Sequence, residues 1–178
     1  MPVLVKDLEI VPDPWKLIDS PGGCDPESVE GCILPFDYWA AEMHAAGGAN
    51  VRSLRSPGVG FWVDGEVEVE RIGPHLEGAS VVAVKFPAFA DGRGLSLGVL
   101  LRSRCGFRGE LRAFGDILPD LAQYLHRSGF DAFVVEGHRA AEVAIASVGS
   151  ITDHYQASVL QAQPAFRRIR SGQLNPSG

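Results

Sequence analysis

An apolar run, Val81-Val-Ala-Val-Lys-Phe86, ends at Pro87 and leads through the polar turn Asp91-Gly-Arg-Gly94 into a leucine-rich stretch that includes Ser96. The run has the length and composition of a buried strand, and the leucines that follow recur at helical spacing. A strand that ends in a charged, glycine-rich turn before a helix is where an α/β protein commonly places its ligand. The stretch therefore predicts an α/β fold and marks a candidate site.

The same order of strand, polar turn and helix repeats along the chain. The expected strands are 32–34, 59–63, 81–86, 110–114 and 131–135, and the expected helices are 38–46, 67–76, 95–104, 118–125 and 139–148. Short strands separated by helix-length segments predict right-handed βαβ crossovers and a mostly parallel sheet, in which 81–86, 110–114 and 132–135 are neighbours. We expect an open doubly wound sheet. The alternative is a partial or half (β/α) barrel, because the units follow one another without an evident reversal.

Three regions of the chain differ in character. Residues 1–31 are expected to form an irregular lead-in, because five prolines and Gly22-Gly23 interrupt them. Residues 32–149 hold the repeated units and form the α/β domain. Residues 150–178 form a polar and basic tail that we expect to fray at its end.

The composition excludes several classes of protein. The chain has 178 residues, 46% of them hydrophobic, which fits one globular domain. Its formal net charge of -6 argues against nonspecific binding to nucleic acid. No apolar run reaches membrane-spanning length, and charges interrupt the N-terminus, so we expect neither a membrane span nor a signal peptide. Three cysteines without a CxxC pair indicate reduced thiols and a cytoplasmic location, although the spacing of Cys24 and Cys32 permits a disulfide.

The loops that follow the strands carry the candidate ligand-binding residues, since such loops gather at one end of a parallel sheet. These residues are Asp91, Gly92, Arg93, Ser96 and Asp116. Arg93 can form a bidentate pair with an oxyanion, and backbone N–H groups at the start of the following helix favour the same charge. A small oxyanion is therefore the expected ligand. A structural interpretation carries equal weight: Asp91 caps the turn, and Arg93 ties two loops together by pairing with Asp116 or Asp120.

No cofactor or catalytic residue is identified by a motif. The chain lacks the GxGxxG pattern and the Walker lysine, and it has no motif for NAD, flavin, haem or an iron–sulfur cluster. None of its five histidines lies at metal-ligand spacing from another His or Cys, so no metal is expected. His126 and Arg127 end a helix, where cations offset the dipole. The cofactor and the catalytic residues stay unknown, and the sequence leaves open whether the protein is an enzyme.

The same region resembles a bacterial family of unknown function whose members are labelled as oxidoreductases of sulfite reduction. The matching segments are 86–94, 100–102, 106–116 and 129–133, with a similar ending at Tyr155-Gln-Ala157 and Pro164. Genes of this family commonly lie near genes for assimilatory sulfite or nitrite reductases. The chain differs from the usual family pattern at Pro119-Asp120-Leu121 and at Ser128, where relatives often carry cysteine.

The resemblance implies one pathway and two hypotheses. The first is an accessory protein of assimilatory sulfur metabolism that binds an oxyanion at the loops after the strands. An oxidoreductase role for it comes from the family label only. The second is a non-enzymatic scaffold that docks on sulfite reductase or on another sulfur-assimilation enzyme.

Overall fold

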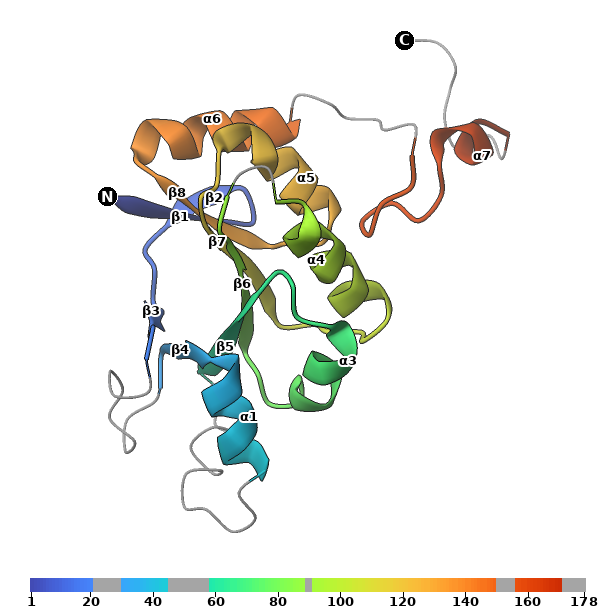
Figure 1. The fold of residues 1–178 in the computed structure, drawn as a ribbon. Coiled ribbons are helices and arrows are strands. Elements are labelled where there is room, and N and C mark those ends of the chain that lie inside the picture. The colour runs from blue at the N-terminus through green and yellow to red at the C-terminus, as the bar shows by residue number, and fades with distance from the viewer. Residues whose placement is uncertain (21–29, 45–57, 89–90, 150–155, 171–178) are drawn as a thin grey trace.

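The structure is a computed structural model that describes residues 1–20, 30–44, 58–88, 91–149 and 156–170. Its strands form one sheet of eight, in the spatial order β2-β1-β8-β7-β6-β5-β4-β3. Figure 1 shows the helices gathered on one side of this sheet, while the segment that carries β3 runs along the opposite side. No helix among the described residues is long and apolar enough to span a bilayer.

The helices and strands alternate from β4 to α6. The strands are β1 (Pro2–Lys6), β2 (Glu9–Val11), β3 (Lys16–Leu17), β4 (Cys32–Pro35), β5 (Val59–Asp64), β6 (Val81–Phe86), β7 (Glu110–Gly115) and β8 (Ala132–Glu136). The helices are α1 (Phe36–His44), α3 (Val69–Ile72), α4 (Arg93–Ser103), α5 (Ala122–Arg127), α6 (His138–Gly149) and α7 (Ala165–Arg170). Two short 3-10 turns, η2 (Gly73–His75) and η3 (Pro119–Leu121), join α3 and α5 to their neighbours.

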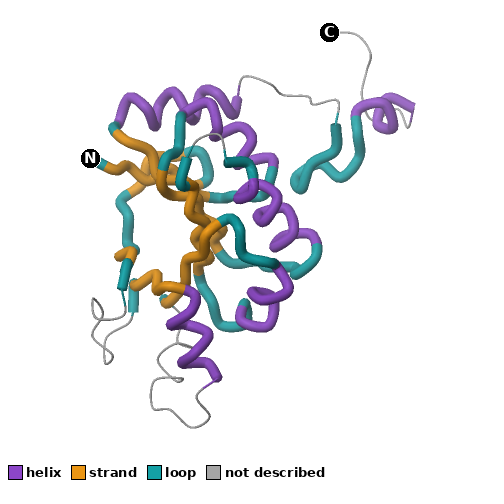
Figure 2. The backbone as a smooth tube through the Cα atoms, viewed as in Figure 1, coloured by secondary structure: helices purple, strands orange, loops and turns teal. Residues whose placement is uncertain are grey.

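The α/β class and the mostly parallel sheet are confirmed. From β3 to β8 every adjacent pair is parallel, and each crossover moves one strand along in the same direction. Strands β6, β7 and β8 are neighbours, as the sequence predicts. Because the strand order never reverses, the topology is the half (β/α) barrel rather than the open doubly wound sheet that we ranked first. Crossovers that all move in one direction put the connecting helices on one face of the sheet, as Figure 2 shows.

The expectation of an irregular lead-in is wrong for part of residues 1–20. β1 pairs antiparallel with β8 and with β2, and β3 pairs parallel with β4. Pro2 is the first residue of β1, and Pro12 and Pro14 lie between β2 and β3; strands tolerate proline at such positions. The sheet therefore begins before residue 32. Cys24, one half of the disulfide that the spacing permits, lies outside the described residues, as does the end of the expected helix 38–46.

The two faces of the sheet bury different side chains, because successive residues of a strand point to opposite sides. The face under the helices holds the main core, which includes Phe61, Val84 and Leu111. The opposite face, called here the inner face, carries a smaller apolar cluster. Its members are Ile33, Val81 and Ala83, with Trp15, Leu17, Trp62 and Phe114 packed against them. Trp15 and Leu17 come from residues 12–18, a segment that crosses the inner face and that we call the strap.

Candidate functional site

Arg93 lies in the first turn of α4, directly after the turn that follows β6. Its Nε donates to Asp91 Oδ1 at 2.8 Å and its Nη2 to Asp91 Oδ2 at 2.6 Å. Its Nη1 lies 2.5 Å from Glu66 Oε1, in the loop after β5. Asp91 also accepts from the backbone N–H of Arg93 at 3.1 Å, so the aspartate closes the turn as a cap would. Arg93 thus joins two loops, although through Glu66 rather than through Asp116 or Asp120.

The charge around Arg93 is balanced by acids. The side-chain hydrogen bond from Arg93 lowers the pKa of Asp91 from 3.8 to about 2, and the same bond raises the pKa of Arg93. A cavity of about 570 Å³ lies beside Arg93, and three glutamates from the β5–α3 region line it. Its second arginine, Arg104, pairs with one of them, Glu70, at 2.5 Å. Carboxylates of the protein thus already pair with both arginines that line this cavity.

Close packing explains the glycines of this turn. A Cβ at Gly94 would lie 2.6 Å from the Phe86 ring, and a Cβ at Gly65 would lie 2.8 Å from the backbone nitrogen of Gly94. These distances are shorter than real Cβ contacts, so both positions require glycine. Gly92 has open space around it. The turn that the sequence singles out therefore packs two loops against the end of β6.

The other two predicted site residues lie on different sides of this turn. Ser96 is exposed on α4 and lines the cavity beside Arg93. Asp116 follows β7, and its backbone N–H donates to Phe86 O at 2.9 Å. Asp116 is not among the residues that line that cavity. The structure thus groups Asp91, Gly92, Arg93 and Ser96, with Asp116 at the neighbouring strand end.

A second group of charged residues lies on the inner face, and the sequence analysis did not identify it. Among the residues that the structure describes, Arg112 of β7 is the one charged residue that is buried, with 2% of its surface exposed. Ala83 of β6 and Ala132 of β8 flank it in the ladder. These two small side chains leave room for a guanidinium between the strands.

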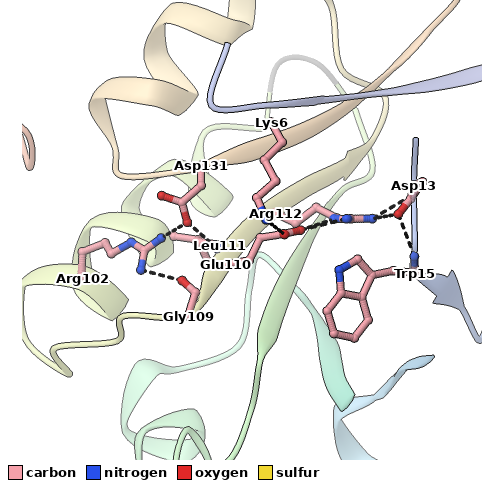
Figure 3. Close-up of polar contacts among 9 residues, drawn as sticks. All are labelled: Lys6, Asp13, Trp15, Arg102, Gly109, Glu110, Leu111, Arg112 and Asp131. Carbon is pink, nitrogen blue, oxygen red and sulfur yellow. Dashed lines mark hydrogen bonds and ion pairs between the residues drawn. The ribbon is translucent and has the colours of Figure 1, made fainter. Parts of the chain in front are cut away.

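Arg112 is held by two carboxylates (Figure 3). Its Nη1 donates to both oxygens of Asp13 on the strap, at 2.9 and 2.8 Å, and its Nε donates to Glu110 Oε1 at 2.8 Å. Glu110 in turn accepts from Lys6 Nζ at 2.8 Å, and this hydrogen bond raises the pKa of Lys6. The network contains two acids and two bases, so its charges cancel. It fastens the strap and β1 to the middle of β7.

One donor of this guanidinium lacks a well-aligned acceptor. Nη2 of Arg112 is buried and lies 2.8 Å from Glu110 Oε1, but it makes no hydrogen bond of acceptable geometry. Buried donors are nearly always satisfied in folded proteins. The exception lies in the wall of a cavity, which gives it a place to find an acceptor.

The cavity between the strap and the inner face has a volume of about 350 Å³. Its lining residues are Pro2, Asp13, Trp15, Leu17, Arg112, Phe114, Gly115, Val134 and Glu136. Most of this wall is apolar, and Arg112 with two acids supplies its charged groups. Pockets for small molecules combine an apolar lining with a few polar groups in this way.

An exposed lysine lies on the inner face beside Phe114, which lines this cavity. Lys85, at the end of β6, is the ladder partner of Phe114. Its Nζ lies 5.5 Å from the centre of the Trp62 ring, and that ring meets Phe114 edge to face at 6.0 Å. The indole N–H of Trp62 donates to Ile18 O at 2.8 Å, which holds the end of the strap. A cation and two aromatic rings therefore lie together on the inner face.

A family model described as a bacterial protein of unknown function (DUF934) matches residues 60–166. This range is more than half of the 178 residues. The chain belongs to this family. No curated protein and no solved structure matches it.

The range matched by the DUF934 model covers most of the half-barrel but not the strap. It includes Arg93, Arg112 and Phe114, while Asp13 and Trp15 precede it. Both candidate sites of this DUF934 protein thus take their arginine from the matched range. The inner-face cavity alone takes part of its wall from the N-terminal segment.

Another polar cluster near β7 is structural (Figure 3). Arg102 of α4 donates to the carbonyl oxygens of Phe107, Gly109 and Gly129 at 2.8–2.9 Å and pairs with Asp131. Asp131 also accepts from the backbone N–H of Leu111 at 2.9 Å. These bonds satisfy backbone groups where β7 and β8 begin, at the end of the sheet opposite the loops that carry ligands in such folds.

Proposed function

We propose that this DUF934 protein is an accessory protein of assimilatory sulfur metabolism that binds a small anion on the inner face of its half-barrel. The observation that carries the proposal is the cavity of about 350 Å³ with the buried Arg112 in its wall. What supports the pathway is the resemblance in sequence to a family whose genes commonly lie near those of sulfite reduction. We favour the inner face over the turn at Arg93 because Arg112 is buried and Arg93 is exposed.

Arg93 and Arg112 differ in how far their side chains are exposed to water. Two carboxylates hold each arginine, but the Arg93 side chain is 56% exposed, so water screens its charge. The Arg112 side chain is 3% exposed, so its hydrogen bonds act in a medium of low dielectric constant, where they are stronger. An apolar wall beside it excludes water from a bound ligand. The set around Asp91 and Arg93 is the second candidate site for the same function.

A titration with matched arginine variants tests this proposal. Sulfite, sulfate, phosphate and adenylylated sulfate are added in turn, and the melting temperature and tryptophan fluorescence are followed. A ligand that binds the native state raises its melting temperature, and Trp15, in the cavity wall, reports on the inner face. We expect at least one of the four anions to produce both changes.

The variants Arg112→Lys and Arg93→Lys then assign the site. Each keeps the charge and removes the planar fork of donors. Arg112→Lys is expected to weaken binding by about ten- to a hundredfold, the value of a hydrogen bond to a charged group. Arg93→Lys is expected to leave binding unchanged. The reverse pattern would place the site at Arg93. If none of the four anions binds, binding of these anions of sulfur assimilation is rejected, and the scaffold hypothesis is favoured.

A further inference from the structure

The Asp13 carboxylate occupies the position in which an anionic ligand would meet Arg112. Both of its oxygens accept from Nη1 of the buried guanidinium. A carboxylate, a sulfonate and a sulfate ester all present charged oxygens to which arginine can donate. We propose that the cavity takes a small organic anion whose charged group replaces Asp13 on Arg112 and whose apolar body packs along Trp15 and Phe114. This inference rests on the proposed function and names its ligand class.

Asp13, rather than Glu110, is the exchangeable partner of Arg112. The Asp13 side chain is 37% exposed and belongs to the strap, so it can turn into water. The Glu110 side chain is 8% exposed, and Lys6 and Arg112 both hold it. Exchange of one anion for another at Arg112 also preserves the charge balance of the buried network. An incoming anion without this exchange would add an uncompensated negative charge beside Glu110, which is costly at a buried site.

Arg112 has a donor that Asp13 leaves without a hydrogen bond. Nη2 of Arg112 is a buried donor without a well-aligned acceptor. A ligand with two or three charged oxygens can satisfy Nη1 and Nη2 together, as a bidentate partner does. Asp13 bonds to Nη1 and not to Nη2. The ligand therefore gains a hydrogen bond that the protein's own carboxylate does not make.

The volume and the apolar wall of the cavity fit a ligand with an organic, apolar part. Its volume of about 350 Å³ is on the order of ten times the ~30 Å³ that one water molecule occupies in the liquid. A single inorganic oxyanion would leave most of that space empty. Trp15, Leu17, Phe114 and Val134 surround the remaining space with apolar surface. The ligand class is thus an aromatic or similarly flat molecule that carries one sulfonate, sulfate or carboxylate group.

Two sulfonates on two variants test the inference. Benzenesulfonate carries the flat body, and methanesulfonate is its control without that body. Asp13→Asn removes the competing charge, and Asp37→Asn is the matched control, because Asp37 forms an exposed ion pair with Arg71 elsewhere. We expect Asp13→Asn to bind benzenesulfonate about tenfold more tightly than wild type does, and Asp37→Asn to bind it as wild type does. Methanesulfonate should bind more weakly to every protein.

A second measurement uses the unchanged protein, in case Asp13→Asn folds poorly. The backbone N–H of Trp15 donates to Asp13 Oδ1 at 3.0 Å. When benzenesulfonate displaces Asp13, this amide loses its acceptor, and its NMR resonance should move as the site fills. Equal affinity in wild type and Asp13→Asn, with the Trp15 amide unmoved, would overturn the exchange but leave the proposed function standing. Absence of benzenesulfonate binding to folded Asp13→Asn would also overturn the inference. The four-anion titration tests the proposed function separately.

Discussion

Arg112 and Asp13 lie 99 positions apart in the sequence and are joined by two hydrogen bonds, from Nη1 to Oδ1 at 2.9 Å and to Oδ2 at 2.8 Å. This contact pins the strap across the inner face of the sheet. It also closes one side of the cavity that we propose as the ligand site. The stability of the N-terminal segment and access to the site are therefore linked through one guanidinium.

Loss of the Arg112 guanidinium should destabilise the fold. In Arg112→Gln the two carboxylates that it holds lose their shared cation, and the Glu110 side chain is only 8% exposed. We expect the free energy of unfolding to fall by roughly 2–4 kcal/mol, between the cost of a lost charged hydrogen bond and that of a broken buried ion pair. Urea unfolding measures this change.

Arg93→Gln is the matched control for Arg112→Gln. It also removes an arginine held by two carboxylates, but at an exposed position where water replaces the lost contacts. Its free energy of unfolding should stay close to that of wild type. Equal losses in the two variants would contradict the view that burial makes Arg112 the stronger clamp.

The turn after β6 offers a sharp test of packing. A Cβ at Gly94 would meet the Phe86 ring at 2.6 Å, while a Cβ at Gly92 would meet nothing within 4 Å. Gly94→Ala should lower the free energy of unfolding by about 1–3 kcal/mol, as overpacking does. Gly92→Ala should leave it unchanged or slightly higher, because its backbone lies in the helical region that alanine prefers. Thermal unfolding measures this difference between two variants whose changes lie two positions apart. Equal effects in the two variants would contradict the close packing of Gly94 against Phe86.

His126 should make stability depend on pH. Partial burial in α5 lowers its pKa from the ordinary value of 6.5, against the smaller opposing effects of Asp131 and Asp7. The folded protein therefore favours neutral His126. Its stabilising contribution is complete above pH 6.5 and is lost as the pH falls through that value towards the lower folded pKa. The sequence suggested a cation that offsets the helix dipole, and burial opposes that role.

Unfolding measured between pH 8 and pH 5 tests this point. Wild type should lose stability as the pH falls, and His126→Gln should lose less over the same range. A variant with the same pH dependence as wild type would show that another group is responsible.

The sequence predicted the repeated units because each carries its own local signals. Val81–Phe86 is a continuous apolar run, and glycines stand where the helices end. The strand order was not predictable in the same way, because the choice between two topologies depends on which face each helix covers. The N-terminal strands β1 and β3 were missed for a related reason. They are short, and long-range pairing with β8 and β4 rather than local preference determines them.

The candidate site shows the same limit. The turn at Arg93 is conspicuous because its charges and glycines are consecutive, yet much of that pattern serves packing and loop connection. Arg112 had a weaker signal: a charged residue in the middle of the expected strand 110–114, with Ala83 and Ala132 on the neighbouring strands. Its partner Asp13 lies in a segment where nothing local indicates a contact with β7. Only the folded chain brings the two together.

The central claim is that an anion binds to Arg112 on the inner face rather than to Arg93 at the loop. The most direct measurement follows the Nε–Hε NMR resonances of the two arginines, assigned through Arg112→Lys and Arg93→Lys, during titration with adenylylated sulfate and with benzenesulfonate. We expect the Arg112 resonance to move and saturate while that of Arg93 stays in place. Movement of the Arg93 resonance with Arg112 unchanged would contradict the account.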